Sequence, residues 1–162
     1  MSEITRLLDQ IRHAFDGEPW SGPSLLSTLE GLTAAQAAQR PLASAHSIWE
    51  ITRHAGVWAE VARRRLVEEK LVQVSDAEDW PSQPENPTES DWQAVLQDLR
   101  STHEQLLSAA SNVPDEALDR PINTVVDARV GYGSSIYVTL HGVAQHYLYH
   151  AGQIALLRKL SA

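Results

Sequence analysis

Apolar residues recur along most of the chain at alternating steps of three and four, a spacing that places them on one face of an α-helix. In the first such segment, Ser2 is a candidate N-cap and Gly17 a candidate stop signal. A later segment begins with Ser47 and Glu50, which are spaced as a capping box. The pattern predicts four substantial helices, over about residues 2–16, 47–72, 88–110 and 134–160.

The segments between these helices are rich in proline, glycine and polar residues, which are typical of turns and loops. Between the first two helices, "SLLSTLEGL" and "TAAQAAQR" predict short helical turns, and Thr33 and Gln36 form a second candidate capping box. Residues 74–90 and 111–133 predict long connections, the second containing a candidate extended piece, "TVVDARV". Helices with single apolar stripes must pack on one another. We therefore expect an all-α four-helix bundle with long connecting loops, forming one domain over residues 1–162.

The chain carries a formal net charge of −8 and has no cysteine, which excludes a disulfide, a thiolate metal site and a cysteine nucleophile. An acidic surface repels phosphate backbones, so we expect no nucleic-acid partner. The one dense basic run, Arg63-Arg64-Arg65, is followed by Glu68 and Glu69 and is interpreted as a solvated helix face. No apolar stretch reaches membrane-spanning length, and the N-terminus does not have the pattern of a signal peptide. We therefore expect a cytoplasmic protein without a membrane partner.

Three of the seven histidines fall within ten residues of the last predicted helix, in "HGVAQHYLYHAGQIALLRKL". His150 lies on the apolar seam itself, and His146 lies one turn earlier on nearly the same face. Two imidazoles at positions i and i+4 can converge on one metal ion without distorting the helix. His141 lies roughly 140° from His146 and 180° from His150 around the helix, so we leave it out of the candidate site. The glutamate that follows the first histidine in an HExxH motif is absent, and with it a built-in general base.

His54, on the second predicted helix, is the candidate third ligand because it flanks the apolar stripe of that helix. Three nitrogen ligands would leave positions open for water or substrate, as in catalytic rather than structural metal sites. Each histidine also has a plain alternative: His54 bonded to a backbone carbonyl, His146 at an interface, His150 satisfied in the core. Three histidines gathered in one core without a shared partner would nevertheless be costly. The remaining three, His13, His46 and His103, are interpreted as surface or pocket-rim residues.

Other residues have candidate roles around this site. Gln153 either orients a ligating imidazole or bonds across the bundle, and Glu50 either caps its helix only or also orients His54. Trp20 and Trp80 lie in predicted loops, where they either line a pocket mouth or pin the loops to the bundle; tryptophans on the helix stripes are expected to fill the core. Two helix-interior glycines, at positions 142 and 152, are costly there, and close helix–helix approach is one reason to keep them.

The order "HSIWEITRHAGVWAEVARRRL", "DWP" and "LHGVAQHYLYHAGQIALLRK" resembles the DinB/YfiT-like family of bacterial four-helix-bundle proteins, and the resemblance extends along almost the whole chain. Its most specific marks are the second-helix histidine and the terminal H-x-x-x-H-x-G-Q-I. By position, the resemblance implies that His54, His146 and His150 are metal ligands for a divalent ion, most often nickel or zinc. It also implies a homodimer, and an activity that uses a low-molecular-weight thiol such as bacillithiol, mycothiol or glutathione.

Three hypotheses for function follow. The first is a metal-dependent hydrolase or thiol S-transferase acting on a small-molecule substrate, with the thiol supplied by a co-substrate because the chain has no cysteine. The second is a non-catalytic protein that binds a metal or a small ligand on the same scaffold. The third is a structural helical dimer whose histidines hold no metal. No residue stands out from the sequence as a catalytic acid or base.

Overall fold

The computed structural model describes residues 1–122 and 134–160, and this part of the chain is all-α. Four long helices alternate with shorter ones, and no strand occurs among the described residues; an isolated antiparallel bridge joins Pro121 and Ser135. The elements are α1 (Glu3–Phe15), α2 (Leu25–Leu29), α3 (Ala34–Ala38), α4 (Ile48–Glu68), α5 (Asp76–Asp79), α6 (Glu89–Ala110), the 3-10 turn η1 (Asp115–Ala117) and α7 (Ile136–Leu160).

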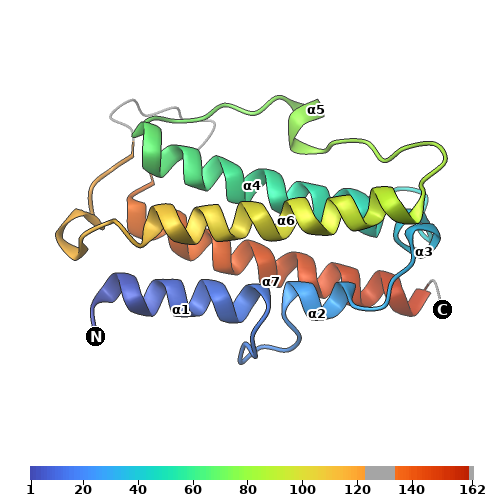
Figure 1. Cartoon of the computed structure of the whole chain (residues 1–162), viewed down its shortest axis with the longest axis horizontal. Helices are drawn as coiled ribbons and strands as arrows, with labels where there is room; N and C mark the ends of the chain where they lie inside the picture. Colours follow the sequence, from blue (N-terminus) through green and yellow to red (C-terminus); the bar gives the residue numbers. More distant parts are fainter. Residues whose placement is uncertain (123–133, 161–162) are drawn as a thin grey trace.

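The four long helices form the predicted bundle (Figure 1). Helix α4 packs against both α6 and α7, and α7 packs against α1. Helices α1 and α2 follow one another along α7, so the two together cover most of its length (Figure 1). The connection from α4 to α6 runs back over α4 and contains α5, which contacts α4. This return path brings the α5 segment to the α4–α7 pair, where the candidate site lies.

The stripes predicted from the sequence are the buried faces of the long helices. Ile48, Ile51 and Ala55 of α4 are buried, and the rings of Trp49 and Trp92 meet in the core with centroids 5.2 Å apart. Trp58, which the stripe also predicts for the core, is only partly buried and lines a cavity between α4 and α7 instead. His103 is 1% exposed and stacks on Phe15, so its prediction as a surface or rim residue is wrong.

Local hydrogen bonds fix the helix ends as predicted at three positions. Ser2 accepts a hydrogen bond from the Thr5 amide, and capping boxes are present at Thr33 with Gln36 and at Ser47 with Glu50. The predicted end of the second long helix near residue 72 is wrong, because α4 stops at Glu68. Glu69 adopts a left-handed conformation with φ of 52°, which takes the chain out of the helix.

The two long connections contain short structure that the sequence pattern did not predict. Ser75 and Glu78 form a capping box that starts α5 within residues 74–90, and η1 lies within 111–133. The candidate extended piece "TVVDARV", residues 124–130, lies outside the described residues.

Glycines 142 and 152 of α7 are not explained by close helix approach, because a Cβ at either position would meet nothing within 4 Å. Across residues 1–122 and 134–160, every helix is too short or too polar to cross a membrane.

Candidate metal centre

The three predicted site histidines come together between α4 and α7. The Nε2 atom of His146 lies 3.1 Å from Nε2 of His54 and 3.0 Å from Nε2 of His150. One nitrogen from each ring lies within 4.8 Å of the others. His54 and His150 are 5% and 3% exposed, and His146 is partly buried. The three rings therefore direct their Nε2 atoms at one shared point.

The two distances to Nε2 of His146 fit ligands of a single ion. Nitrogen ligands about 2.1 Å from one ion lie about 3.0–3.4 Å apart when the angle between them is between a right angle and the tetrahedral value. The observed Nε2–Nε2 distances of 3.0 and 3.1 Å are those of the smaller angle. The ligand nitrogens of His54 and His150 lie within 4.8 Å of each other.

The hydrogen bonds on the far side of two rings fix where their protons lie. Nδ1 of His54 lies 2.8 Å from the backbone oxygen of Asp79 and 3.0 Å from its carboxylate Oδ1. Nδ1 of His150 lies 2.6 Å from Oε1 of Gln153. Because all three partners are acceptors, each Nδ1 carries the proton and each Nε2 of a neutral ring presents a lone pair.

Two lone pairs therefore point at Nε2 of His146 from two sides. If His146 carries a proton on that atom, it can donate to only one of them, and the other lone pair remains unsatisfied in a buried place. If it carries none, three lone pairs face one another. A cation at the shared point satisfies all three at once, so the donor set fits a metal ion.

Burial keeps the three rings neutral. It lowers the pKa of His54 and brings the pKa of His146 to about 3 and that of His150 to about 4, with further lowering from the neighbouring histidines. At neutral pH the rings are therefore uncharged, so each can present a lone pair to a metal ion.

Trp80 covers one side of the cluster. Its ring stacks on His54, with centroids 3.8 Å apart and planes 6° apart, and on its other face it stacks on His46 at 3.7 Å. The His46 side chain is 45% exposed, in agreement with its prediction as a rim residue. Trp80 therefore lines the site, whereas Trp20 is fully exposed and does not.

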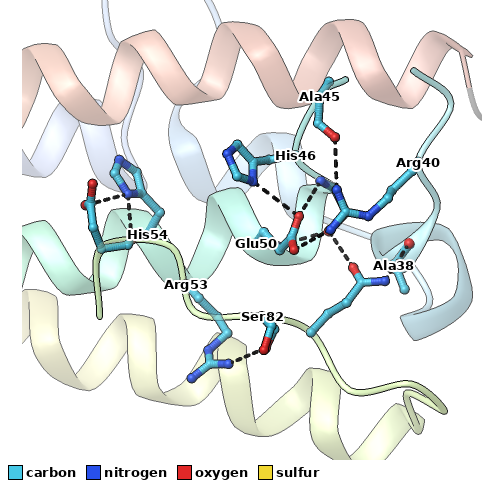
Figure 2. A network of polar contacts seen from close by, with 11 residues as sticks. Ala38, Arg40, Ala45, His46, Glu50, Arg53, His54 and Ser82 are labelled. Atoms are coloured by element: carbon cyan, nitrogen blue, oxygen red, sulfur yellow. Dashed lines mark hydrogen bonds and ion pairs between the residues drawn. The ribbon is translucent and has the colours of Figure 1, made fainter. Parts of the chain in front are cut away.

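Of the two candidate orienting residues, Gln153 contacts a site histidine and Glu50 does not. Figure 2 shows the Glu50 carboxylate directed at Arg40 and His46, away from His54. Glu50 also accepts from the Ser47 amide, so capping and the Arg40 ion pair account for it.

Asp79 is the orienting residue that the sequence did not predict. Besides contacting His54, its Oδ1 accepts a hydrogen bond of 2.6 Å from Nε1 of Trp58. It stands 25 residues from His54 in a predicted loop, so no periodic signal connects the two. His141, which we left out, is outside the cluster and packs on Tyr137 with ring centroids 4.6 Å apart.

A cavity of about 250 Å³ between α4 and α7 reaches the cluster at His146. We name it the α4–α7 cavity. It is lined by Trp58, Ala59, Ala62, Arg65, Ser134, Val138, Thr139, Gly142, Val143, His146 and Tyr147. A larger cavity of about 550 Å³ lies between α4, α6 and the α5 segment, and none of the three histidines lines it. Of these two cavities, the α4–α7 cavity is the one that a site histidine lines.

Comparison with known proteins agrees with the resemblance that the sequence suggested. Residues 20–154, most of the chain, match the DinB superfamily. The crystal structure of a conserved protein from Enterococcus faecalis is similar to this chain with a TM-score of 0.70 and 17% sequence identity, covering 99% of this chain and 97% of that one. At this identity the likeness shows the fold alone. No curated protein was found to match.

Proposed function

The chain belongs to the DinB superfamily, and we propose that it is a divalent-metal protein in which Nε2 of His54, His146 and His150 holds one ion, nickel or zinc. The observation that carries this proposal is the proton arrangement. Acceptors at Nδ1 hold His54 and His150 in the tautomer whose Nε2 lone pair points at His146. A cation between the rings would remove the clash of these lone pairs.

We further propose that the protein is a metal-dependent thiol S-transferase or hydrolase. A divalent ion with three histidine ligands has open positions, where it supplies Lewis acidity by lowering the pKa of a thiol or water or by polarising a carbonyl. The thiol must come from a co-substrate because the chain has no cysteine.

The residues around the cluster support this role because they orient the histidine rings and exclude water from them. Asp79 holds His54, Gln153 holds His150, and Trp80 covers the outer side of the His54 ring. Among the described residues that line the α4–α7 cavity, none is a carboxylate that could act as a general base. A nucleophile at the cluster would therefore release its proton to solvent water, with its pKa lowered by the ion that the three histidines would hold.

Metal content tests the first part of the proposal. Protein purified without a histidine tag is stripped with a chelator, reloaded with nickel or zinc, and measured by elemental analysis. We expect one ion per chain in the wild type and in His141→Ala, and loss of the bound ion in His150→Ala. His141 is the matched control because it lies on the same helix outside the cluster. Equal metal content in the two variants would contradict the proposal.

Turnover tests the second part. The wild type loaded with nickel or zinc is assayed for conjugation of glutathione, bacillithiol and mycothiol to 1-chloro-2,4-dinitrobenzene, and for hydrolysis of p-nitrophenyl acetate. We expect turnover that requires the metal and disappears in His150→Ala. Stoichiometric metal binding without metal-dependent turnover would instead favour a non-catalytic metal-binding protein.

A further inference from the structure

Three consecutive arginines of α4 have different environments. Arg63 bonds Glu60 and Arg64 bonds Glu68, each with an Nε–oxygen distance of 2.7 Å. These two agree with the interpretation of the run as a solvated helix face. Arg65 does not, because it turns toward the α4–α7 cavity and lines it.

Arg65 has no ion pair within residues 1–122 and 134–160, and its Nε atom is buried without a hydrogen-bond partner. Its Cζ atom lies 5.6 Å from the ring centroid of Trp58, a cation–π contact that leaves the N–H groups free. Glu69, one turn further along, bonds Arg120 at 2.7 Å instead. A buried guanidinium N–H without an acceptor is costly, so its partner is expected to come from outside the described residues.

Thr139 of α7 lines the same cavity and carries a second unpaired group. The residue is 8% exposed, and its Oγ1 is buried without a hydrogen-bond partner. A threonine inside a helix can donate to the carbonyl one turn earlier, and Thr52 does so to Ile48 at 2.7 Å. Thr139 forms no such bond, so one cavity-lining residue of α4 and one of α7 each carry an unsatisfied hydrogen-bond donor.

Trp58 lies between Arg65 and the histidine cluster. Its ring centroid lies 6.1 Å from that of His146 and 5.6 Å from Cζ of Arg65, so His146 and Arg65 are at most about 12 Å apart. The cavity volume of about 250 Å³ is below the range of about 300–1,000 Å³ of sites for drug-sized ligands. A small molecule can therefore contact the cluster at one end and Arg65 at the other.

We propose that Arg65 and Thr139 form an anion-binding subsite, and that the small-molecule substrate carries a carboxylate at the end remote from the three histidines. The inference rests on the proposed function, since it names the substrate class of that site. A guanidinium matches a carboxylate with two parallel hydrogen bonds, and the Thr139 hydroxyl supplies a further donor. None of the described residues that line the cavity is acidic, so the cavity attracts anions although the chain has a net charge of −8.

The test compares two thiols of equal length that differ in charge, 3-mercaptopropionate and 3-mercapto-1-propanol, by calorimetric titration of the nickel-loaded protein. Breaking a hydrogen-bonded contact to a charged group changes affinity by about tenfold or more. We therefore expect the ratio of the two affinities to fall about tenfold from the wild type to Arg65→Gln, while nickel affinity is unchanged. Comparing ratios removes any intrinsic preference of nickel for the charged thiol.

Arg64→Gln is the matched control, because Arg64 is the neighbouring arginine and is paired with Glu68 on the surface. We expect its affinity ratio to equal that of the wild type. Thr139→Val keeps the shape of the side chain and should lower the ratio a few-fold, which keeps the test valid if Arg65→Gln does not fold. An unchanged ratio in both Arg65→Gln and Thr139→Val would overturn the inference.

Two further arms separate this inference from the proposed function. If the protein holds no metal, the proposed function fails, but propionate titrated into metal-free protein still tests the subsite. Binding that Arg65→Gln abolishes would support the subsite, and no binding by the wild type would overturn it. Inorganic phosphate is the last probe, and competition by phosphate stronger than that by propionate would contradict the assignment to a carboxylate.

Discussion

Asp79→Asn should weaken divalent-metal binding about tenfold while the fold is retained. The Asp79 carboxylate lies 3.0 Å from Nδ1 of His54 and accepts from Nε1 of Trp58 at 2.6 Å. Asparagine has nearly the same shape and keeps an oxygen acceptor, so the substitution removes the charge that makes the His54 ring a stronger ligand and leaves the packing in place.

The size of the effect follows from the two oxygens that hold His54. Loss of a residue that orients a metal-ligating histidine costs about 10- to 100-fold in metal affinity. The backbone oxygen of Asp79, 2.8 Å from the same Nδ1, is unaffected by the substitution and continues to fix the tautomer. We therefore expect the lower end of this range, about tenfold or about 1.4 kcal/mol of binding free energy.

Competition against a chromophoric chelator at fixed pH measures the metal affinity, and circular dichroism checks the fold. Asp76→Asn is the matched control, since Asp76 lies on the same short helix, is exposed and is not in the cluster. We expect its metal affinity to equal that of the wild type. A folded Asp79→Asn protein with unchanged metal affinity, or an equal loss in Asp76→Asn, would refute the role given to Asp79.

Three more predictions concern stability. Burial lowers the pKa of His103 to about 4, so the unfolded chain takes up a proton there that the folded chain does not. In urea titrations between pH 7 and 4, the unfolding free energy of the wild type should therefore fall by about 3 kcal/mol more than that of His103→Gln. Equal pH dependence in both proteins would contradict this. Gly152→Ala should raise the unfolding free energy by about 1 kcal/mol, because alanine favours the helix and its Cβ has open space. Gly17→Ala should lower it, because the new Cβ would lie 2.9 Å from Cα of His13. If denaturation curves show that both substitutions change the unfolding free energy in the same direction, the reasoning is wrong. Trp92→Phe should cost about 1–3 kcal/mol, since it leaves the carbonyl of Leu32 without its buried donor, and an unchanged denaturation midpoint would exclude that loss.

The long helices and the histidine cluster could be predicted because both depend on helical spacing. His146 and His150 share a face through a four-residue step, and His54 flanks a stripe that must face another helix. Helical spacing also bears on His103 and Arg65. His103 continues the stripe of Leu99 at a four-residue step and is buried. Arg65 likewise extends the α4 stripe, three residues beyond Ala62, and lines the cavity.

The roles of Asp79 and Trp80 could not be predicted from spacing. Both lie in the connection between α4 and α6, and their contacts with His54 exist only because this connection runs back over α4 (Figure 1). A path of this kind is decided by packing between distant segments rather than by local sequence. The proline-rich and acidic composition of the segment predicts a loop and carries no information about its direction.

Anomalous scattering from crystals of the nickel- or zinc-loaded protein, recorded at the absorption edge of the metal, tests the central claim most directly. We predict one peak per chain between α4 and α7, about 2.1 Å from Nε2 of each of His54, His146 and His150. A peak elsewhere on the chain, or no peak at the cluster in fully loaded protein, would contradict the claim that these three nitrogens share one ion.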